Sequence, residues 1–192
     1  GERDHGALDV AVDIARADPE VRLKVLDAVD PGGATLDAPF LREPGLVGAV
    51  LSGAVAAGLI ADGIHVAPEV MRIALAARPE GVFLVSDAMC VAGTGLTEFR
   101  LGGRRILRHA GRLTLEDGTL AGADLSLPQA LRVMVKTVGI PADRALAMAT
   151  SAPAQLIGAQ AGRLAAGASA DFIHLDDDWQ LRQVWRGGRP LL

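Results

Sequence analysis

A single acidic residue, Asp87, follows an apolar run that extends from Val82 to Val85. The run has no alternating polar positions, which predicts a strand buried on both faces, as in a parallel sheet. In a barrel of parallel strands, the carboxyl ends of the strands form the floor of the active site, so Asp87 is a candidate acid or base. The spacing equally allows Asp87 to cap the following helix or turn, and both interpretations stay open at this point.

The segments before this strand predict the elements that position it. Leu59–Ala61 is a short apolar stretch typical of a strand. Pro68 then begins a helix with Met71 and Leu75 on one face, and Pro79 follows its end. Because strand, helix and strand alternate, we expect βαβ units of an α/β fold.

The rest of the chain predicts hairpins, then helices, then a small β element. Alternating segments separated by Gly-Gly and Asp-Gly pairs predict strands near residues 99–101, 105–107 and 112–115. Apolar residues at helical spacing predict helices at residues 127–138, 141–149 and 151–158, with Gly139 as a C-cap. The tail predicts strands at residues 171–175 and 181–185. Upstream, the patterns predict a helix at 7–17, a strand at 21–25, and either a helix or a buried strand at 46–55.

Composition excludes several classes of protein. Of the 192 residues, 50% are hydrophobic, so a sizeable core is available and global disorder is excluded. The net charge of −4 makes nucleic acids and anionic membrane surfaces poor partners. No segment provides the run of about 18 apolar residues that a membrane span needs. The one cysteine, Cys90, cannot form an internal disulfide, which fits a reducing cytoplasm.

Several other reactive side chains match no motif. His5, His109 and His174 lie in predicted turns or strands, and we interpret them as structural or solvated. The acidic run at residues 176–178 is typical of a solvated turn rather than of a cation site. Cys90 has no identifiable histidine partner, so it is not a predicted nucleophile.

Four motifs follow one another along the chain, at Arg42–Ala49, Ile60–His65, Leu84–Met89 and Asp117–Gly122. In sequence and order they resemble motifs of the N-acetylglucosamine-6-phosphate deacetylases, which belong to the amidohydrolase superfamily. The tail segment Gly162–Ile173 resembles the segment by which such enzymes return to their small β domain. Together the four motifs are specific to the deacetylases, whereas the tail marks only the superfamily.

The resemblance implies a fold for the whole family: a metal-bearing (β/α)8 barrel joined to a β-sandwich that both chain ends build. This chain would hold the later part of that TIM-like barrel and the C-terminal strands of the sandwich, an α/β architecture. We therefore predict a partial barrel over residues 1–158 and a C-terminal β element of the small domain over residues 159–192.

The metal ligands of the family are not matched in this sequence. The resemblance implies a divalent ion, zinc or iron, held by a Glu that would precede residue 1 and by two His expected near Val25 and Thr35. Around these positions, predicted strands run into the following segments without the connection of about 2–6 residues that a strand needs to turn back as a helix. We therefore expect that loops are missing near residues 25–26 and 35–41.

The resemblance also implies roles for single side chains. Asp87 resembles the catalytic residue that takes a proton from a metal-activated water and passes it to the departing amine. His65 resembles a histidine that stabilises the developing oxyanion, although a histidine at a strand end alone more often hydrogen-bonds backbone. Arg42 resembles a phosphate-binding arginine, and the alternative is a solvated arginine paired with Glu43.

The implied substrate-binding set includes backbone as well as side chains. Residues 120–122 resemble a segment that lines the substrate pocket, and the alternative is a plain hairpin end. Gly63 precedes His65 and is suited to a backbone angle that other residues resist. The implied substrate-binding residues are Arg42, Asp62, Gly63, Ile64, His65, Leu120, Ala121 and Gly122.

These expectations imply one reaction, the hydrolysis of N-acetylglucosamine 6-phosphate to glucosamine 6-phosphate and acetate. The partner would be a small amino-sugar phosphate. In the family, phosphate-binding side chains can come from a neighbouring subunit, so a homodimer is implied. One alternative is another amidohydrolase, acting on a cyclic amide or a different acetamide. The other is a non-catalytic relative that binds phosphosugars or only assembles, having lost its metal ligands.

Overall fold

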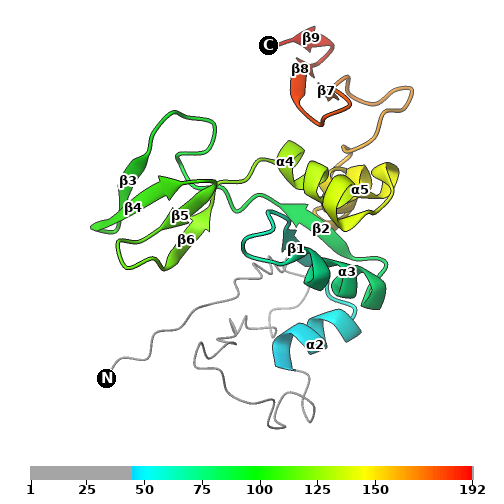
Figure 1. The fold of residues 1–192 in the computed structure, drawn as a ribbon. Coiled ribbons are helices and arrows are strands. Elements are labelled where there is room, and N and C mark those ends of the chain that lie inside the picture. The colour runs from blue at the N-terminus through cyan, green and yellow to red at the C-terminus, as the bar shows by residue number, and fades with distance from the viewer. Residues whose placement is uncertain (1–44, 192) are drawn as a thin grey trace.

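The computed structural model describes residues 45–191 of the chain (Figure 1). The predicted helix at 7–17, the strand at 21–25 and the proposed missing loops near 25–26 and 35–41 lie outside the described residues. The first described element is helix α2 (Gly45–Ser52), so the open choice for residues 46–55 is decided in favour of a helix.

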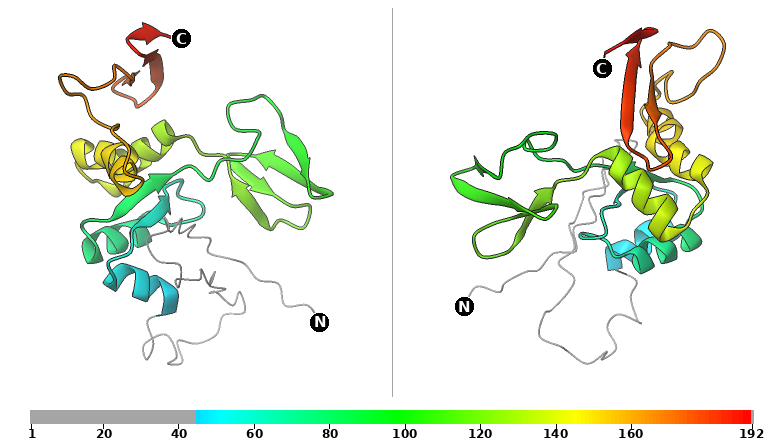
Figure 2. Two further views of the ribbon diagram at one scale, coloured as in Figure 1. Left: turned by 180° about the vertical axis from the view of Figure 1, so that it is seen from behind. Right: turned by 45° about the horizontal axis from the view of Figure 1, so that its top comes forward.

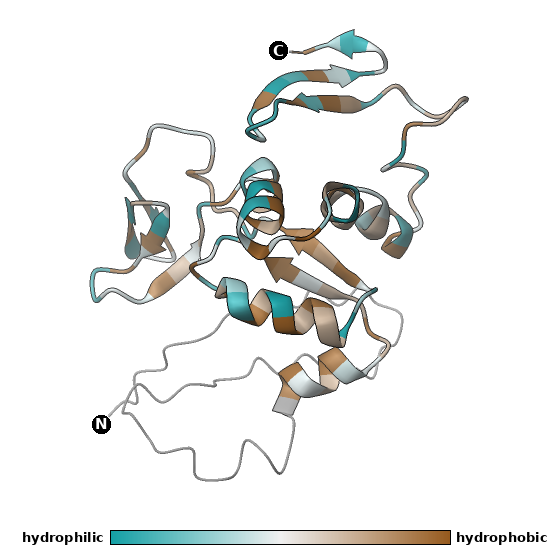
Figure 3. Ribbon diagram, turned by 45° about the vertical axis from the view of Figure 1, so that its right-hand side comes forward, coloured by the Kyte–Doolittle hydropathy of each residue, from teal (hydrophilic) through white to brown (hydrophobic). Residues whose placement is uncertain are grey.

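A βαβ unit forms the centre of the described chain. Strand β1 (Ala57–Ile60) and strand β2 (Val82–Val85) are parallel neighbours, with Ile60 paired with Val85. Helix α3 (Pro68–Ala77) connects them. Its proline occupies the first turn, where the N–H that proline lacks would have no partner within the helix. All four residues of β1 are buried. In the apolar run of β2, Val82, Phe83 and Leu84 are buried as predicted, and Val85 is half-buried. Figure 3 colours both strands mostly brown, for apolar residues.

A group of helices packs against β2. Helix α4 (Leu127–Arg132), helix α5 (Ala142–Ala149) and helix α6 (Ser151–Leu156) each contact that strand. The main core therefore joins the βαβ unit to these helices, and its fully buried side chains include Ile60, Met71 and Met134. None of the helices between residues 45 and 191 is both long and apolar enough to cross a bilayer.

The predicted helix at 127–138 is not uniformly α-helical. Its second half is the π-helix η1 (Val133–Val138), which contacts α3. The predicted C-cap is confirmed: Gly139 has a φ of 86°, and its N–H donates to the carbonyl of Met134. A π-turn of this kind is not visible in a pattern of apolar residues, because it changes the hydrogen-bond partner rather than the residue types.

The hairpin segments form one antiparallel sheet with its own small core. Its strands, in order, are β3 (Glu98–Leu101), β4 (Arg104–His109), β5 (Arg112–Thr114) and β6 (Leu120–Ala123). Figures 1 and 2 show this sheet projecting to one side of the βαβ unit. Val91, Ile106 and Leu113 are buried between the sheet and the loop that follows β2.

The C-terminal element is a three-stranded antiparallel sheet of β7 (Phe172–Leu175), β8 (Leu181–Arg186) and β9 (Arg189–Pro190). The rings of Phe172 and Trp185 stack with centroids 4.6 Å apart. Leu175 and Trp179 pack against the main core, which ties the element to the helices. The predicted β tail is confirmed, and the division at residues 158 and 159 stays a prediction.

Candidate active site

A tight turn after β1 holds His65 in place. One carboxylate oxygen of Asp62, Oδ1, accepts the backbone N–H groups of Ile64 and His65 at 2.8 and 2.9 Å. The other, Oδ2, lies 2.6 Å from Nδ1 of His65. Gly63 has a φ of 74°, a conformation that residues with a Cβ rarely adopt. Asp62 therefore fixes both the turn and the orientation of the imidazole.

Burial and hydrogen bonding act in opposite directions on Asp62. Burial raises the pKa of this carboxyl group, but the hydrogen bonds from the His65 ring and from the two backbone N–H groups hold the pKa below its ordinary value. The side chains of Asp62 and His65 are 7% and 3% exposed, so the pair is formed away from bulk water. The group is therefore an anion at neutral pH and accepts the Nδ1–H of the imidazole.

Asp87 follows strand β2 at the position that corresponds to Asp62 after strand β1. Ile60 and Val85 are the last paired residues of β1 and β2, and Asp62 and Asp87 each follow by two positions. Because the strands are parallel, the two acidic residues lie at the same edge of the sheet. Asp87 is exposed and has a φ of 46°, a strained angle for a residue with a side chain.

The end of β6 lies directly beside the Asp87 backbone. The Ala123 N–H donates to the Asp87 carbonyl at 3.1 Å, and the Met89 N–H donates to the Ala123 carbonyl at 3.1 Å. Ala88 and Ala123 form an isolated parallel bridge. Residues 120–122, predicted to bind substrate, thus belong to a strand whose end is bonded to the predicted catalytic segment. Their role in binding substrate stays a prediction.

Gly122 makes the close approach possible. Its φ is 84°, and a Cβ built there would lie 2.5 Å from Cγ and 2.7 Å from Sδ of Met89. Leu120 and Ala121, the other two residues of this segment, are half-buried. A glycine is therefore suited to this position both by its backbone angle and by the space available.

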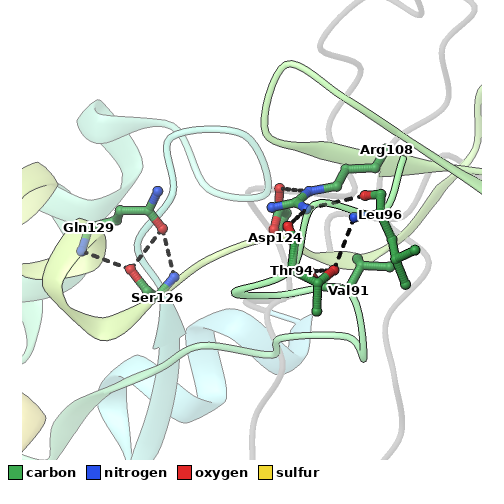
Figure 4. Close-up of polar contacts among 7 residues, drawn as sticks. All are labelled: Val91, Thr94, Leu96, Arg108, Asp124, Ser126 and Gln129. Carbon is green, nitrogen blue, oxygen red and sulfur yellow. Dashed lines mark hydrogen bonds and ion pairs between the residues drawn. The ribbon is translucent and has the colours of Figure 1, made fainter. Parts of the chain in front are cut away.

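An ion pair that the sequence motifs did not reveal lies next to this junction (Figure 4). Nε of Arg108 donates to Oδ2 of Asp124 at 2.7 Å, and Nη1 of the same guanidinium donates to the carbonyls of Thr94 and Leu96. The two charged residues are 16 positions apart on different strands or strand ends, so no local spacing rule identifies them.

The remaining candidates fall outside residues 45–191, are exposed, or lie in a turn of the described chain. Arg42, the predicted phosphate-binding residue, is outside the described residues. His109, His174 and Cys90 are exposed. Asp176 accepts hydrogen bonds within its own turn and pairs with Arg182, so the acidic run serves as a bend.

The described residues do not provide a metal site. Between residues 45 and 191, no group of three or more His, Cys, Asp or Glu side chains is arranged to hold an ion. The positions near Val25 and Thr35, where the resemblance places two ligands, lie outside this range. Members of the amidohydrolase family generally use a divalent metal. Because residues 45–191 contain no such set of ligands, they do not by themselves fit a divalent metal ion.

Comparison with known proteins identifies the family. The model of the amidohydrolase family matches residues 46–191. The chain belongs to the amidohydrolase family. It is 36% identical over 151 residues to a putative N-acetylgalactosamine-6-phosphate deacetylase of Escherichia coli, covering 77% of this chain and 90% of that protein. It is 35% identical to the N-acetylglucosamine-6-phosphate deacetylase of Bos taurus, covering 77% of this chain and 38% of that one.

Solved amidohydrolases have the same fold over most of the described residues. The N-acetylglucosamine-6-phosphate deacetylase of Pasteurella multocida superposes with a TM-score of 0.72 at 28% identity, covering 74% of this chain and 38% of that one. The enzyme of Thermotoga maritima gives 0.72 at 30% identity, with 79% and 42% covered. The predicted family and fold class, the later part of an amidohydrolase barrel with following strands, are therefore confirmed. The chain spans less than half the length of these solved relatives.

Proposed function

We propose that the whole protein hydrolyses the N-acetyl group of N-acetylglucosamine 6-phosphate, giving glucosamine 6-phosphate and acetate. The observation that carries the proposal is the position of Asp62 and Asp87, two residues beyond paired strand ends, in a chain of the amidohydrolase family. The names of the bovine and Pasteurella relatives support this substrate class.

Asp87 is the proposed proton carrier. An amine leaves an amide poorly unless it is protonated, so the reaction needs a group that takes a proton from the attacking water and delivers it to nitrogen. A carboxylate at the open end of a parallel strand suits that task.

His65 is the proposed donor to the acetamide oxygen. Asp62 engages Nδ1, so Nε2 is the ring nitrogen that would face the substrate. An anionic Asp62 can neutralise an imidazolium whose Nε2–H donates to the developing oxyanion. The proposed backbone contacts come from Gly63, Ile64 and residues 120–122, and Arg42 is the proposed phosphate ligand.

The proposal includes no step through a metal ion. Zinc or iron remains an expectation from the family, with ligands outside residues 45–191. A homodimer and a cytoplasmic location are likewise proposals. They follow from the implied sharing of phosphate ligands between subunits and from the single cysteine.

N-acetylgalactosamine 6-phosphate is the second candidate substrate. The relatives from Escherichia coli and Shewanella, at 36% and 35% identity, are named for the galactosamine compound. The bovine relative, at 35%, is named for the glucosamine compound. Identity at this level does not separate the two sugars, so both belong in the assay.

The experiment measures acetate release by the full-length protein from both sugar phosphates, together with its bound zinc and iron. We expect turnover, and we expect Asp87→Asn to lower kcat by about 10²–10⁴-fold, the range for loss of general acid–base catalysis. Asp177→Asn is the matched control, because Asp177 is an exposed aspartate in the acidic turn. Metal-free protein that binds the sugar phosphate without turnover would instead identify the non-catalytic relative.

A further inference from the structure

The candidate catalytic residue, Asp87, lies beyond the end of β2, and a backbone hydrogen bond with Ala123 holds it there. It follows β2, has a φ of 46°, and accepts through its carbonyl the N–H of Ala123. A second backbone hydrogen bond joins the same two segments, because the Met89 N–H donates to the carbonyl of Ala123. Two backbone hydrogen bonds therefore tie Ala123 to the segment that carries Asp87.

Asp124, the residue after Ala123, carries the next contact. Its carboxylate is 10% exposed and accepts Nε of Arg108 at 2.7 Å. On its other side, Leu125 is buried in the main core, and Ser126 begins α4 with a capping box completed by Gln129 (Figure 4). The Asp124 backbone is thus fixed between the Asp87 junction and the start of a helix.

Arg108 extends the contact to the loop that follows Asp87. Nη1 donates to the carbonyls of Thr94 and Leu96 at 2.6 and 3.2 Å, and the Arg108 backbone N–H donates to the carbonyl of Thr97. Its guanidinium therefore connects strand β4, the end of β6 and the far end of the loop that begins at Ala88. The planar fork of an arginine suits such a three-way contact, whereas the single ammonium of a lysine does not.

The loop itself packs between these polar contacts and the sheet. Val91 is fully buried against Ile106 and Leu113, and Met89 and Ala121 pack on the same cluster. The loop is closed by Thr94, whose hydroxyl donates to the Val91 carbonyl and accepts the Leu96 N–H. The loop after Asp87 is thus joined to the four-stranded sheet by an apolar cluster and by the hydrogen bonds from Arg108 to the carbonyls of Thr94 and Leu96.

We infer that Arg108 and Asp124 form a positioning pair for the Asp87 carboxylate. The inference rests on the proposed function, because it assigns the pair a role in that reaction. Neither residue is placed in contact with substrate. The pair acts through the Asp87–Ala123 backbone bonds, so loss of its geometry displaces the proton carrier without removing it.

The test compares Arg108→Lys and Asp124→Asn with Arg105→Lys in the full-length protein. Arg105 lies on the same strand as Arg108, but its guanidinium pairs with the exposed side chains of Glu98 and Glu116. We expect the first two variants to lower kcat by about 10- to 100-fold, the range for a misplaced catalytic group, with a smaller change in KM. Arg105→Lys should leave kcat at the wild-type level.

A role of Arg108 that does not act through Asp87 predicts that the two substitutions lower kcat independently. If Arg108 acts through Asp87, Arg108→Lys should have no further effect on kcat in the Asp87→Asn background, because the two changes then remove one interaction. Equal kcat values for Arg108→Lys and wild type, measured below the melting temperature of both, overturn the inference. Additive losses in the double variant overturn it as well.

A readout without turnover separates this inference from the proposed function. Amide hydrogen exchange of residues 88–97 and 120–125 reports the Asp87–Ala123 junction directly. Faster exchange in Arg108→Lys but not in Arg105→Lys supports the structural half of the inference even if the wild-type protein releases no acetate. In that case the proposed function fails. Unchanged exchange in both variants overturns the positioning pair whatever the activity.

Discussion

The N–H of Ala123 donates to the carbonyl of Asp87 at 3.1 Å, and this bond joins two segments that lie 36 positions apart. It brings the end of β6 to the end of β2, where the family resemblance places a catalytic carboxylate. The same edge of the sheet carries Asp62 and His65. The candidate site is therefore a junction of three chain segments.

Asp62 should make stability depend on acid pH. Its pKa is lower in the folded chain than its ordinary value of 3.8, so its contribution to stability is complete above that pH. The contribution is lost as the pH falls through the folded value, because protonation ends the bond to His65. Denaturant unfolding of wild type and Asp62→Asn from pH 7 to pH 2 should show two curves that differ at neutral pH and converge only as the pH falls below the ordinary value of 3.8.

Asp62→Asn should also reduce activity at neutral pH. An amide at position 62 carries no negative charge beside Nδ1 of His65, although its carbonyl oxygen can still accept the backbone N–H groups of Ile64 and His65. We expect kcat to fall while the fold is kept, and circular dichroism checks the fold. Wild-type kcat in this variant would contradict the proposed role of the turn.

Gly122→Ala should affect the site more than Gly118→Ala does. Both glycines have positive φ angles, 84° and 91°, so each substitution costs about 1–2 kcal/mol of backbone strain. Only Gly122 faces Met89; nothing lies within 4 Å of a Cβ at Gly118. Acetate release should therefore fall only for Gly122→Ala, and adding Met89→Ala should restore part of it. Equal losses for the two glycines would show that strain alone matters.

Ser126→Ala should weaken the start of α4. The serine hydroxyl accepts the Gln129 N–H, and the Gln129 side chain accepts the Ser126 backbone N–H. The substitution removes the first of these two bonds and leaves the second. The expected loss is about 1 kcal/mol in the free energy of unfolding, measured in urea. Ser126→Asp should retain most of the stability because aspartate is also a favourable N-cap. If both variants lose the same amount, the cap is not the cause.

Met134→Ala should be the most damaging single change in the helical group. Met134 is fully buried in the main core, and truncation of such a side chain costs about 2–5 kcal/mol. Leu146→Ala is the control, because Leu146 is 40% exposed on α5 and its truncation leaves no enclosed cavity. A small loss in Met134→Ala would mean that the π-helical segment collapses onto the vacated space.

The sequence alone determined the local elements of this protein. The apolar run before Asp87, the proline at the start of α3, the Gly-rich turns of the hairpins and the glycine after η1 each act over a few residues, so their patterns predicted structure correctly. The sequence and order of the four motifs also predicted the family, and the comparisons confirm that prediction.

Only the tertiary structure decided which of these elements meet. The bonds between Asp87 and Ala123, and between Arg108 and Asp124, join strands and loops that no local pattern relates. The π-helical segment η1 was also invisible, since a pattern of apolar residues does not show which carbonyl each N–H bonds. The physical reason is that local propensity acts within one or two turns of chain, whereas register and burial depend on which surfaces the folded chain brings together.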